Sequence, residues 1–311
     1  MKVIHQLDQL PDIDGLVLTI GTFDGVHRGH QELLQTIISK ANSTNGTSGL
    51  ITFHPHPRMI LNPGNKSLKL LTSIEERAHL LEQLGLDYLF IVPFSADFSS
   101  MSAEAYVKDF LVGKFHPKHI VIGYDHRFGK GRSGGVELLN ELAESMNYEL
   151  TQINEQTIND ITLSSTKIRE LLGEGSIEAA NELLGYRYTF EGYVVHGEKR
   201  GRTIGFPTAN LVPTEELKLI PGNGVYAVLA EIDGQQHPAM LNIGTRPTFD
   251  GKSKTIEAHI LDYEGNLYGK KLVITFACFV RSERQFSNSE ELINQLNTDE
   301  KNVRKTFSVE N

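Results

Sequence analysis

The chain has 311 residues, enough for two domains, and its 39 acidic and 30 basic side chains give a net charge of −9. Neither half of the sequence is basic, which argues against binding to nucleic acid, and the single cysteine excludes an internal disulfide framework or a cysteine-rich zinc site. The first residues lack the apolar core of a signal peptide, and the longest apolar stretch, 272–280, is too short to span a membrane. We therefore expect a globular cytoplasmic protein, a monomer or weak homo-oligomer, that binds neither nucleic acid nor membrane.

Strand-like runs alternate with helical patterns in the first half of the sequence. The runs are short and rich in Val, Ile, Leu and Tyr, and apolar residues recur at helical spacing between them. Such alternation predicts βαβ units and a parallel sheet, whose ligands bind beyond the carboxyl ends of the strands. The predicted strands lie at 16–20, 50–53, 88–92, 119–122 and 148–153.

The second half predicts mainly strands. Asp233-Gly234 is a strong hairpin signal, and Ser287 and Glu290 have the capping-box spacing of a helix over 287–296. A small antiparallel barrel with a C-terminal helix is the natural interpretation, and the domains are expected to be 1–185 and 186–311. The predicted strands lie at 188–195, 225–232, 236–243, 255–261 and 271–281.

A run rich in glycine and histidine, 21–30, follows the first strand and leads into a helical pattern. Three glycines allow a tight turn, and His27 and His30 stand at a helix N-terminus, where free N–H groups favour an anion. This arrangement suits the stabilisation of charge on a transferring phosphoryl group. The alternative is a plain strand-to-helix turn with surface histidines.

A second candidate anion site opens a later helix, at 163–169. Ser164, Ser165 and Thr166 could simply cap the helix, but no Glu or Gln holds the capping-box position. Lys167 and Arg169 instead place cations in the first turn, which makes sense if an anion binds there.

Two further segments of the first half are less specific. His54 and His56, after the second strand, could bind a metal, but without acidic partners nearby a substrate-lining loop is favoured. The run 129–134 matches GxGxxG, yet it follows the fourth strand rather than the first. It is better explained as a mobile loop that brings Lys130 and Arg132 over phosphates, and the chain has no Walker A motif.

In the second half, the glycine-rich basic run 197–210 could hold phosphate on its backbone N–H groups. Thr208 and Asn210 lie on one side of an extended chain and offer oxygen ligands suited to Mg²⁺. The alternative is an ordinary loop with a polar tip. Strand alternation places Glu257 and His259 on one face, which by itself favours a solvent-facing Glu257. Cys278, inside an apolar strand, is expected to be a buried small hydrophobe.

These motifs, in this order, resemble those of the prokaryotic bifunctional riboflavin kinase/FMN adenylyltransferase family over nearly the whole chain. The run 27–30 resembles the HxGH signature of nucleotidyltransferases, and 164–169 resembles their second signature in its flavin-specific form. The run 123–129 resembles the GxDFxFG segment, although His126 stands where Phe is usual. The run 201–210 resembles the riboflavin kinase GRxxGxPTAN signature.

The resemblance implies a Rossmann-like nucleotidyltransferase domain that moves AMP from ATP onto FMN, giving FAD and pyrophosphate with the aid of Mg²⁺. His27 and His30 would steady the ATP phosphates, and Arg169 would hold the triphosphate and the leaving pyrophosphate. His56, Asp125 and Arg127 would line the FMN site. Further contacts with ATP phosphates are expected from Gly21, Phe23, Asp24, Ser164, Ser165 and Thr166.

For the second domain, the resemblance implies a riboflavin kinase barrel. Glu257, in the family's ExH segment, would be the base that takes the proton from the riboflavin 5′-hydroxyl as it attacks the γ-phosphate. Thr208 and Asn210 would hold Mg²⁺, and Arg281 and Phe286 would border the isoalloxazine ring. The ATP-binding residues would be Gly197, Gly201, Arg202, Gly205, Pro207 and Thr208.

Two alternatives stay open on the sequence. The barrel could bind flavin without kinase activity, although intact Thr208, Asn210 and Glu257 argue against this. The first domain could transfer a nucleotide to a different phosphate with the same HxGH chemistry, although the barrel signatures argue against that. The expected small molecules are riboflavin, FMN and ATP.

Overall fold

The computed structural model describes residues 1–308 except 65–67, 155–156, 159–160, 198–199 and 249–250. The chain divides into two compact units, Met1–Ser165 and Thr166–Asn311. The division falls at the start of α8 (Ser165–Glu174), so α8 and α9 (Ile177–Leu184) group with the second unit. The domain boundary predicted after residue 185 remains a prediction.

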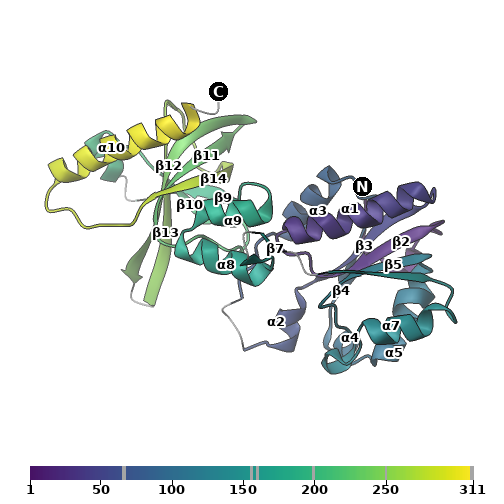
Figure 1. The fold of residues 1–311 in the computed structure, drawn as a ribbon. Helices are drawn as coiled ribbons and strands as arrows, with labels where there is room; N and C mark the ends of the chain where they lie inside the picture. Colours follow the sequence, from purple (N-terminus) through teal and green to yellow (C-terminus); the bar gives the residue numbers. More distant parts are fainter. Residues whose placement is uncertain (65–67, 155–156, 159–160, 198–199, 249–250, 309–311) are drawn as a thin grey trace. The chain divides into compact units, whose positions relative to one another are not determined.

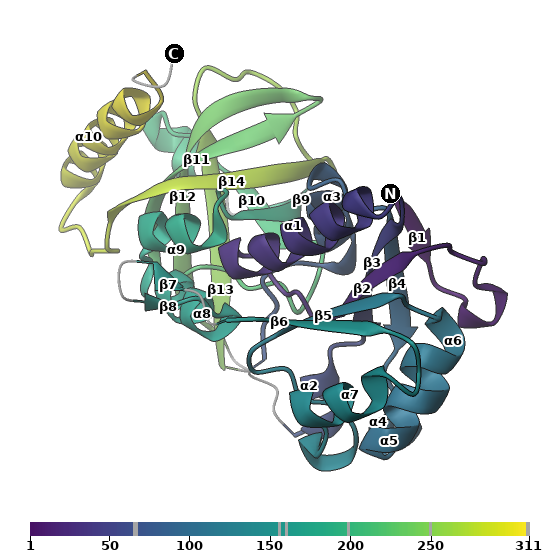
Figure 2. The same ribbon diagram turned by 45° about the vertical axis from the view of Figure 1, so that its right-hand side comes forward.

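The first unit is built on a six-stranded parallel sheet with helices on both faces (Figures 1 and 2), which confirms the predicted α/β fold. The edge strand β1 (Lys2–Ile4) was not predicted, because three residues are too few to show a pattern. The other strands, which match the predicted ones to within a few residues, are β2 (Leu16–Ile20), β3 (Thr47–His54), β4 (Tyr88–Pro93), β5 (His119–Gly123) and β6 (Glu149–Ile153).

The strand order of this sheet is β1-β4-β3-β2-β5-β6. From β2 the chain winds outward through β3 and β4, whereas β5 and β6 lie on the other side of β2. The order therefore reverses between β2 and β5, and the connections at their carboxyl ends diverge there. Such a switch point is where open α/β sheets bind ligands.

Two apolar layers hold the helices on the sheet. α1 (Arg28–Ser43) contributes Leu34 and Ile37 to one layer, and Leu81 of α3 (Ile74–Gln83) joins them. The other face is covered by the π-helix η2 (Tyr106–Val112) and by α7 (Val136–Ala143). The shorter elements are η1 (Leu7–Gln9), α2 (Pro57–Leu61), α4 (Ala96–Ser99), α5 (Ala103–Ala105), α6 (Gly113–Phe115), η3 (Lys130–Arg132), β7 (Thr157–Ile158) and β8 (Ile161–Thr162).

The second unit contains a closed antiparallel barrel, which confirms the predicted architecture. The predicted hairpin is present: Asp233 and Gly234 both have positive φ, as a type I′ turn requires, and Ile232 pairs with Gln235. The strand order around the barrel is β10-β13-β12-β11-β14-β9. The bounds are β9 (Thr189–Val195), β10 (Ala209–Pro213), β11 (Gly224–Ile232), β12 (Gln235–Thr248), β13 (Gly251–Ile260) and β14 (Lys271–Arg281).

Two elements of the barrel unit differ from the prediction. The sequence does not predict β10, because the polar residues around it hide the apolar alternation. The C-terminal helix α10 (Ser289–Ser308) is much longer than 287–296, and its Val303 is fully buried with Phe206 and Met240. The short η4 (Arg200–Ile204) precedes β10.

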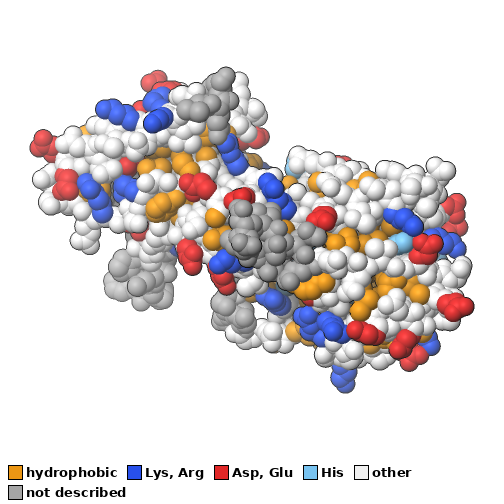
Figure 3. Space-filling view, viewed as in Figure 1, with side chains coloured by type: hydrophobic (Ala, Val, Ile, Leu, Met, Phe, Trp, Pro, Cys, Tyr) orange, Lys and Arg blue, Asp and Glu red, His pale blue; other side chains and the backbone are white. Residues whose placement is uncertain are grey.

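The surface bears charges of both signs. On the face drawn in Figure 3, basic and acidic side chains are interspersed over both units. Among the described residues, no helix is long and apolar enough to cross a membrane.

The barrel core depends on Phe276 of β14, which is fully buried and lies against the rings of Tyr188, Phe190 and Tyr226. Phe276→Ala should lower the free energy of unfolding of the barrel by about 3–5 kcal/mol, because it removes buried apolar area and leaves a cavity. Tyr193→Ala, at a half-exposed position of β9, should change it by less than about 0.5 kcal/mol. Hydrogen exchange of barrel amides in urea measures both, and equal effects would contradict this description of the core.

Candidate functional site

The loop between β2 and α1 contains three residues with positive φ. Phe23 has φ +48°, Gly25 +84° and Val26 +37°. Glycine adopts such angles readily, but a phenylalanine and especially a β-branched valine are strained there, at a cost of roughly 1–3 kcal/mol each. The loop lies at the switch point of the sheet and ends at the N-terminus of α1. The strained residues therefore lie in the same segment that is predicted to bind phosphate.

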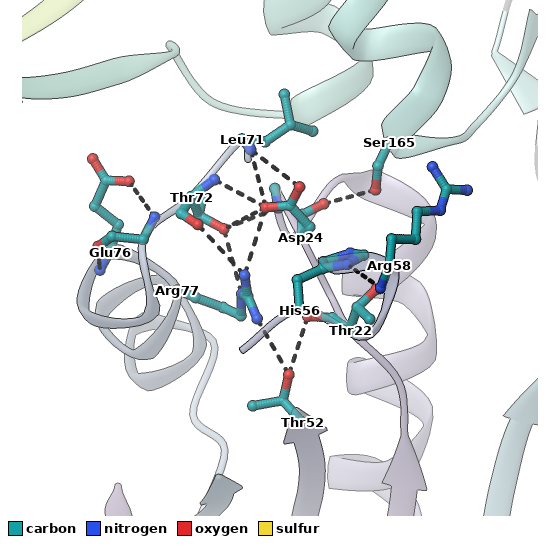
Figure 4. Close-up of polar contacts among 12 residues, drawn as sticks. Thr22, Asp24, Thr52, His56, Arg58, Leu71, Thr72, Glu76, Arg77 and Ser165 are labelled. Carbon is teal, nitrogen blue, oxygen red and sulfur yellow. Dashed lines mark hydrogen bonds and ion pairs between the residues drawn. The ribbon is translucent and has the colours of Figure 1, made fainter. Parts of the chain in front are cut away.

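Asp24 lies in the middle of this loop, and its carboxylate is buried (Figure 4). It accepts hydrogen bonds from the backbone N–H groups of Leu71 and Thr72 at 3.0–3.1 Å and from the Thr72 hydroxyl at 3.1 Å. The same hydroxyl accepts the N–H of Gly25 at 3.1 Å. The carboxylate therefore fastens the loop from inside, and a contact of Asp24 with phosphate would use its backbone.

Arg77 of α3 forms an ion pair with this carboxylate. The guanidinium Nη2 lies 3.6 Å from Asp24 Oδ1, and both side chains are almost fully buried. Arg77 also donates to the hydroxyl of Thr52 at 3.3 Å, and Thr52 in turn donates to the Thr22 carbonyl at 3.1 Å. The guanidinium is thus linked to the loop on both sides of Phe23 (Figure 4).

His27 and His30 are stacked at the N-terminus of α1, with ring centroids 3.7 Å apart. His27 is the N-cap: its Nδ1 accepts the backbone N–H of His30 at 3.4 Å. His30 also stacks on Phe23, at 4.5 Å, and its Nδ1 is buried without a hydrogen-bond partner among the described residues. Burial first, and then the nearby His27 and Arg77, hold the pKa of His30 well below its usual value. His30 is therefore neutral at physiological pH.

The second predicted element begins where α8 starts. The Ser165 hydroxyl donates to the Asp24 carbonyl at 2.8 Å, so it meets the glycine- and histidine-rich loop directly. Ser164 precedes the helix, and Thr166 and Arg169 belong to the second unit. The phosphate-binding roles of these four residues stay predictions.

The segment after β5 carries Asp125, His126 and Arg127. Asp125 and Arg127 are exposed, and Arg127 Nη1 lies 3.7 Å from Glu137. The Nε2 atom of His126 is buried without a hydrogen-bond partner among the described residues. Burial, the largest cause, lowers the pKa of His126 to about 4; Arg132 also lowers it, and Asp125 opposes them.

The remaining motifs of the first unit shape loops. His56 is buried and caps α2, with Nδ1 accepting the N–H of Arg58 at 3.1 Å (Figure 4). The GxGxxG run folds back on itself, because Phe128 and Gly134 form an antiparallel bridge. Phe128 in turn stacks on Tyr106 at 5.0 Å.

The barrel unit has a cavity of about 300 Å³ between its wall and α10. Glu257 and Thr208 line it, and the Thr208 hydroxyl donates to Glu257 Oε2 at 3.4 Å. Glu257 pairs across the sheet with Asn210 on β10 and with Asn242 on β12. Strand alternation was right about the two faces of β13, but the face with Glu257 forms the cavity wall.

The glycine-rich loop contacts the same strands. A Cβ atom on Gly197 would overlap the Asn210 amide, and one on Gly201 would overlap the carbonyl of Phe206. The loop therefore needs glycine at position 201 for close backbone approach, whereas the atoms near Gly197 belong to the end of a side chain. Residues 198–199 of this predicted loop lie outside the described residues. Arg202, Gly205 and Pro207 are exposed.

An ion pair joins Arg281 of β14 to Asp299 of α10 at the other side of the cavity. Arg281 Nη2 lies 2.8 Å from Asp299 Oδ2, and Asp299 also accepts from Gln295 at 2.7 Å. Phe286 lines the cavity, with Arg284 over its ring at 4.6 Å. Sequence reasoning missed Asp299 because nothing in the sequence distinguishes a buried acid from an exposed one on a charged helix. The one signal was an arginine, Arg281, at the end of an apolar strand, where it needs a partner.

Oxygen donors gather on one side of the barrel. Asn210 on β10 and Glu257 on β13 face each other across the sheet, and the Thr208 hydroxyl, from just before β10, contacts the Glu257 carboxylate. Such donors suit Mg²⁺, which binds few protein ligands and keeps water and phosphate oxygens as the rest. Among the described residues, no group of three or more His, Cys, Asp or Glu side chains could hold a metal.

Comparison with known proteins finds two family models that match the two halves of the chain and relatives that match nearly all of it. The FAD synthetase family model matches residues 10–167, and the riboflavin kinase model matches 184–307. Curated proteins named bifunctional riboflavin kinase/FMN adenylyltransferase are similar over almost the full length. The protein from Listeria monocytogenes is 40% identical over 97% of this chain and 95% of its own, and that from Escherichia coli K12 is 36% identical over 99% and 98%.

A solved structure is similar over the whole chain as well. It is a crystal structure from Streptococcus pneumoniae described as a macrolide-efflux protein, with a TM-score of 0.89 and 30% sequence identity. It covers 97% of this chain and 98% of its own. The folds of both units therefore recur in an experimental structure.

His126 makes stability depend on pH. Because its folded-state pKa of about 4 lies below the usual 6.5, the unfolded chain takes up the proton first, and stability falls as the pH drops through this range. His126→Phe should remove about 1–2 kcal/mol of the loss between about pH 7 and about pH 5, as urea unfolding can measure. His5→Phe, at an exposed position, is the control and should leave the loss unchanged. An unchanged pH dependence of stability in His126→Phe would show that His126 does not cause this loss.

Proposed function

The chain belongs to the bifunctional riboflavin kinase/FMN adenylyltransferase family, and from that premise we propose how its residues carry the two reactions. The barrel unit phosphorylates riboflavin with ATP to give FMN, and the parallel-sheet unit adenylylates FMN with a second ATP to give FAD and pyrophosphate. The observation that carries the assignment is that each unit presents its own set of reactive groups at one place: stacked histidines at a helix N-terminus, and a carboxylate in a barrel cavity.

In the adenylyltransferase unit, an oxygen of the FMN phosphate attacks the α-phosphorus of ATP. One P–O bond forms there as the bond to the β-phosphate oxygen breaks, and pyrophosphate leaves. The phosphate is already an anion, so no protein base or nucleophile is required, and catalysis consists of alignment and charge stabilisation. We assign these tasks to His27, His30 and the N–H groups at the start of α1.

The other predicted groups complete this site. Gly21, Phe23 and Asp24 contribute backbone of the strained loop to the phosphates. His56, Asp125 and Arg127, from the loops after β3 and β5, border FMN. Ser164, Ser165, Thr166 and Arg169 are assigned to the triphosphate and the leaving pyrophosphate.

In the kinase unit, the riboflavin 5′-hydroxyl attacks the γ-phosphorus of ATP, and ADP leaves. An alcohol is a weak nucleophile, so a base must accept its proton, and we assign this role to Glu257. The Thr208 hydroxyl, hydrogen-bonded to Glu257, fixes the position of the carboxylate. The phosphates of ATP are assigned to the loop residues Gly197, Gly201, Arg202, Gly205, Pro207 and Thr208.

A magnesium ion fits the oxygen donors Thr208 and Asn210. When bound, it would neutralise charge on the ATP phosphates. Arg281 and Phe286 are assigned to the isoalloxazine ring: Asp299 fixes the guanidinium on one wall of the cavity, and Phe286 supplies an aromatic surface beside it. We further propose that the protein acts in the cytoplasm on small molecules, as a monomer or weak homo-oligomer, with the domain boundary near residue 185.

The assignment of the first site predicts that His30→Ala abolishes FAD formation from FMN, because the triphosphate loses part of its alignment. A loss of about 100-fold or more is expected, while FMN formation from riboflavin stays within about twofold of wild type. Chromatographic separation of the fluorescent flavin products, with Mg-ATP and either riboflavin or FMN, measures both rates. His5→Ala, at an exposed position, is the control. Equal loss of both activities would refute the assignment.

The assignment of the second site predicts the opposite pattern for Glu257→Gln. The amide cannot accept the hydroxyl proton, so FMN formation should fall by about 100-fold or more, whereas FAD formation from added FMN survives. The same product assay applies, with Glu264→Gln, exposed on the same unit, as the control. A normal kinase rate would show that Glu257 is not the base, and a wild-type protein that makes FAD only from FMN would make the barrel a flavin-binding module.

A further inference from the structure

Arg77 of α3 is buried and polar, and it lies outside every motif of the sequence. Only 3% of its surface is exposed, and its partners include the Asp24 carboxylate and the polar groups of Thr52 and Thr72. A buried ion pair is weak evidence for stabilisation, since an apolar pair of similar volume often serves the fold as well. The contacts of Arg77 therefore point to another task.

These contacts converge on the strained part of the β2–α1 loop. Through Asp24, Arg77 is connected to the residue between Phe23 and Gly25; through Thr52, it is connected to the Thr22 carbonyl (Figure 4). Positive φ at Phe23 and Val26 persists only where the surroundings over-determine it. Phe23 carries the ring on which His30 stacks, so the shape of this loop sets the position of both histidines.

We propose that Arg77 is a positioning residue for FMN adenylylation, which holds the β2–α1 loop from inside through Asp24 and Thr52 and so fixes the stacked pair His27–His30. Arg77 does not touch the substrates; it acts through the loop and through its charge. The proposal rests on the adenylyltransferase role assigned to the two histidines above.

The charge of Arg77 acts on His30 as well. The titratable or charged groups that bear on the His30 ring are His27 beside it and Arg77 from α3, and Asp24 partly neutralises Arg77. Arg77 is one of the causes that hold the pKa of His30 low, after burial and His27. Loss of the guanidinium would also leave the buried Asp24 carboxylate uncompensated, and both changes favour protonation of His30.

The test compares Arg77→Met and Arg77→Lys in the full chain, with Lys114→Met as the control because it removes an exposed cation of the same unit. Three quantities are measured: FAD formation from FMN over a range of pH, FMN formation from riboflavin, and the His30 titration by NMR of labelled histidine, assigned with His30→Gln. Wild-type FAD formation is measured first, because its absence would refute the adenylyltransferase role itself rather than the role of Arg77.

For Arg77→Met we expect kcat/KM for FMN to fall about 10- to 100-fold, with its acidic limb and the His30 titration both shifted to higher pH. The kinase rate should stay at its wild-type value. Arg77→Lys keeps the charge but not all of the hydrogen bonds, so it should lose about tenfold in kcat without any shift of the titration.

Two outcomes would overturn the proposal. One is FAD formation by Arg77→Met that is unchanged, or reduced equally at every pH with an unshifted His30 titration; the residue would then serve only the fold. If Arg77→Met does not fold, Arg77→Lys decides: wild-type FAD formation by that variant would show that the network does not position the site.

Discussion

The β2–α1 loop can keep its shape only because a buried carboxylate pulls it inward. Positive φ at Phe23 and Val26 is unfavourable. The hydrogen bonds of Asp24 to the backbone of residues 71–72 and its ion pair with Arg77 offset this cost. The turn in the chain that results places His27 as the cap of α1 and His30 against Phe23. The reactive end of the first unit therefore depends on residues that lie far apart in the sequence.

In the barrel, strand pairing rather than a strained loop brings the polar groups of the site together. Glu257 stands between Asn210 and Asn242 across three neighbouring strands, so register alone gathers the polar groups. The glycine-rich loop approaches this row of residues: Gly197 lies against the Asn210 side chain, and the absence of a Cβ at Gly201 leaves room for the Phe206 carbonyl. No strained residue is needed there, because directly opposed positions in a sheet share a face.

Both architectures were predictable from the sequence because periodicity and turn signals are local properties of the chain. Every strand predicted from them is present in the structure. The prediction missed β10, a strand of five residues with a polar Asn210 and a terminal proline, and the final half of α10. Within the sites, glycine and histidine runs were visible because the reactive residues are close in sequence. Arg77 and Asp299 were not, since a buried charge on a helix looks like a solvated one until its partner is known.

The two reactions differ in where a carboxylate should lie relative to the nucleophile, and the chain carries them out on two different folds. A carboxylate beside a phosphate nucleophile repels it, and the acid of the strained loop, Asp24, is turned inward and bonded to amides and to Arg77, whereas Asp125 is assigned to the border of FMN. An alcohol nucleophile needs a carboxylate within reach, and Glu257 lies in the wall of the cavity. A helix N-terminus at a switch point suits the phosphate nucleophile, and a barrel strand with one face on a cavity suits the alcohol. Under the assignment proposed above, the order of the reactions, kinase before adenylyltransferase, follows from this chemistry, because the alcohol must become a phosphate before a site without a base can use it.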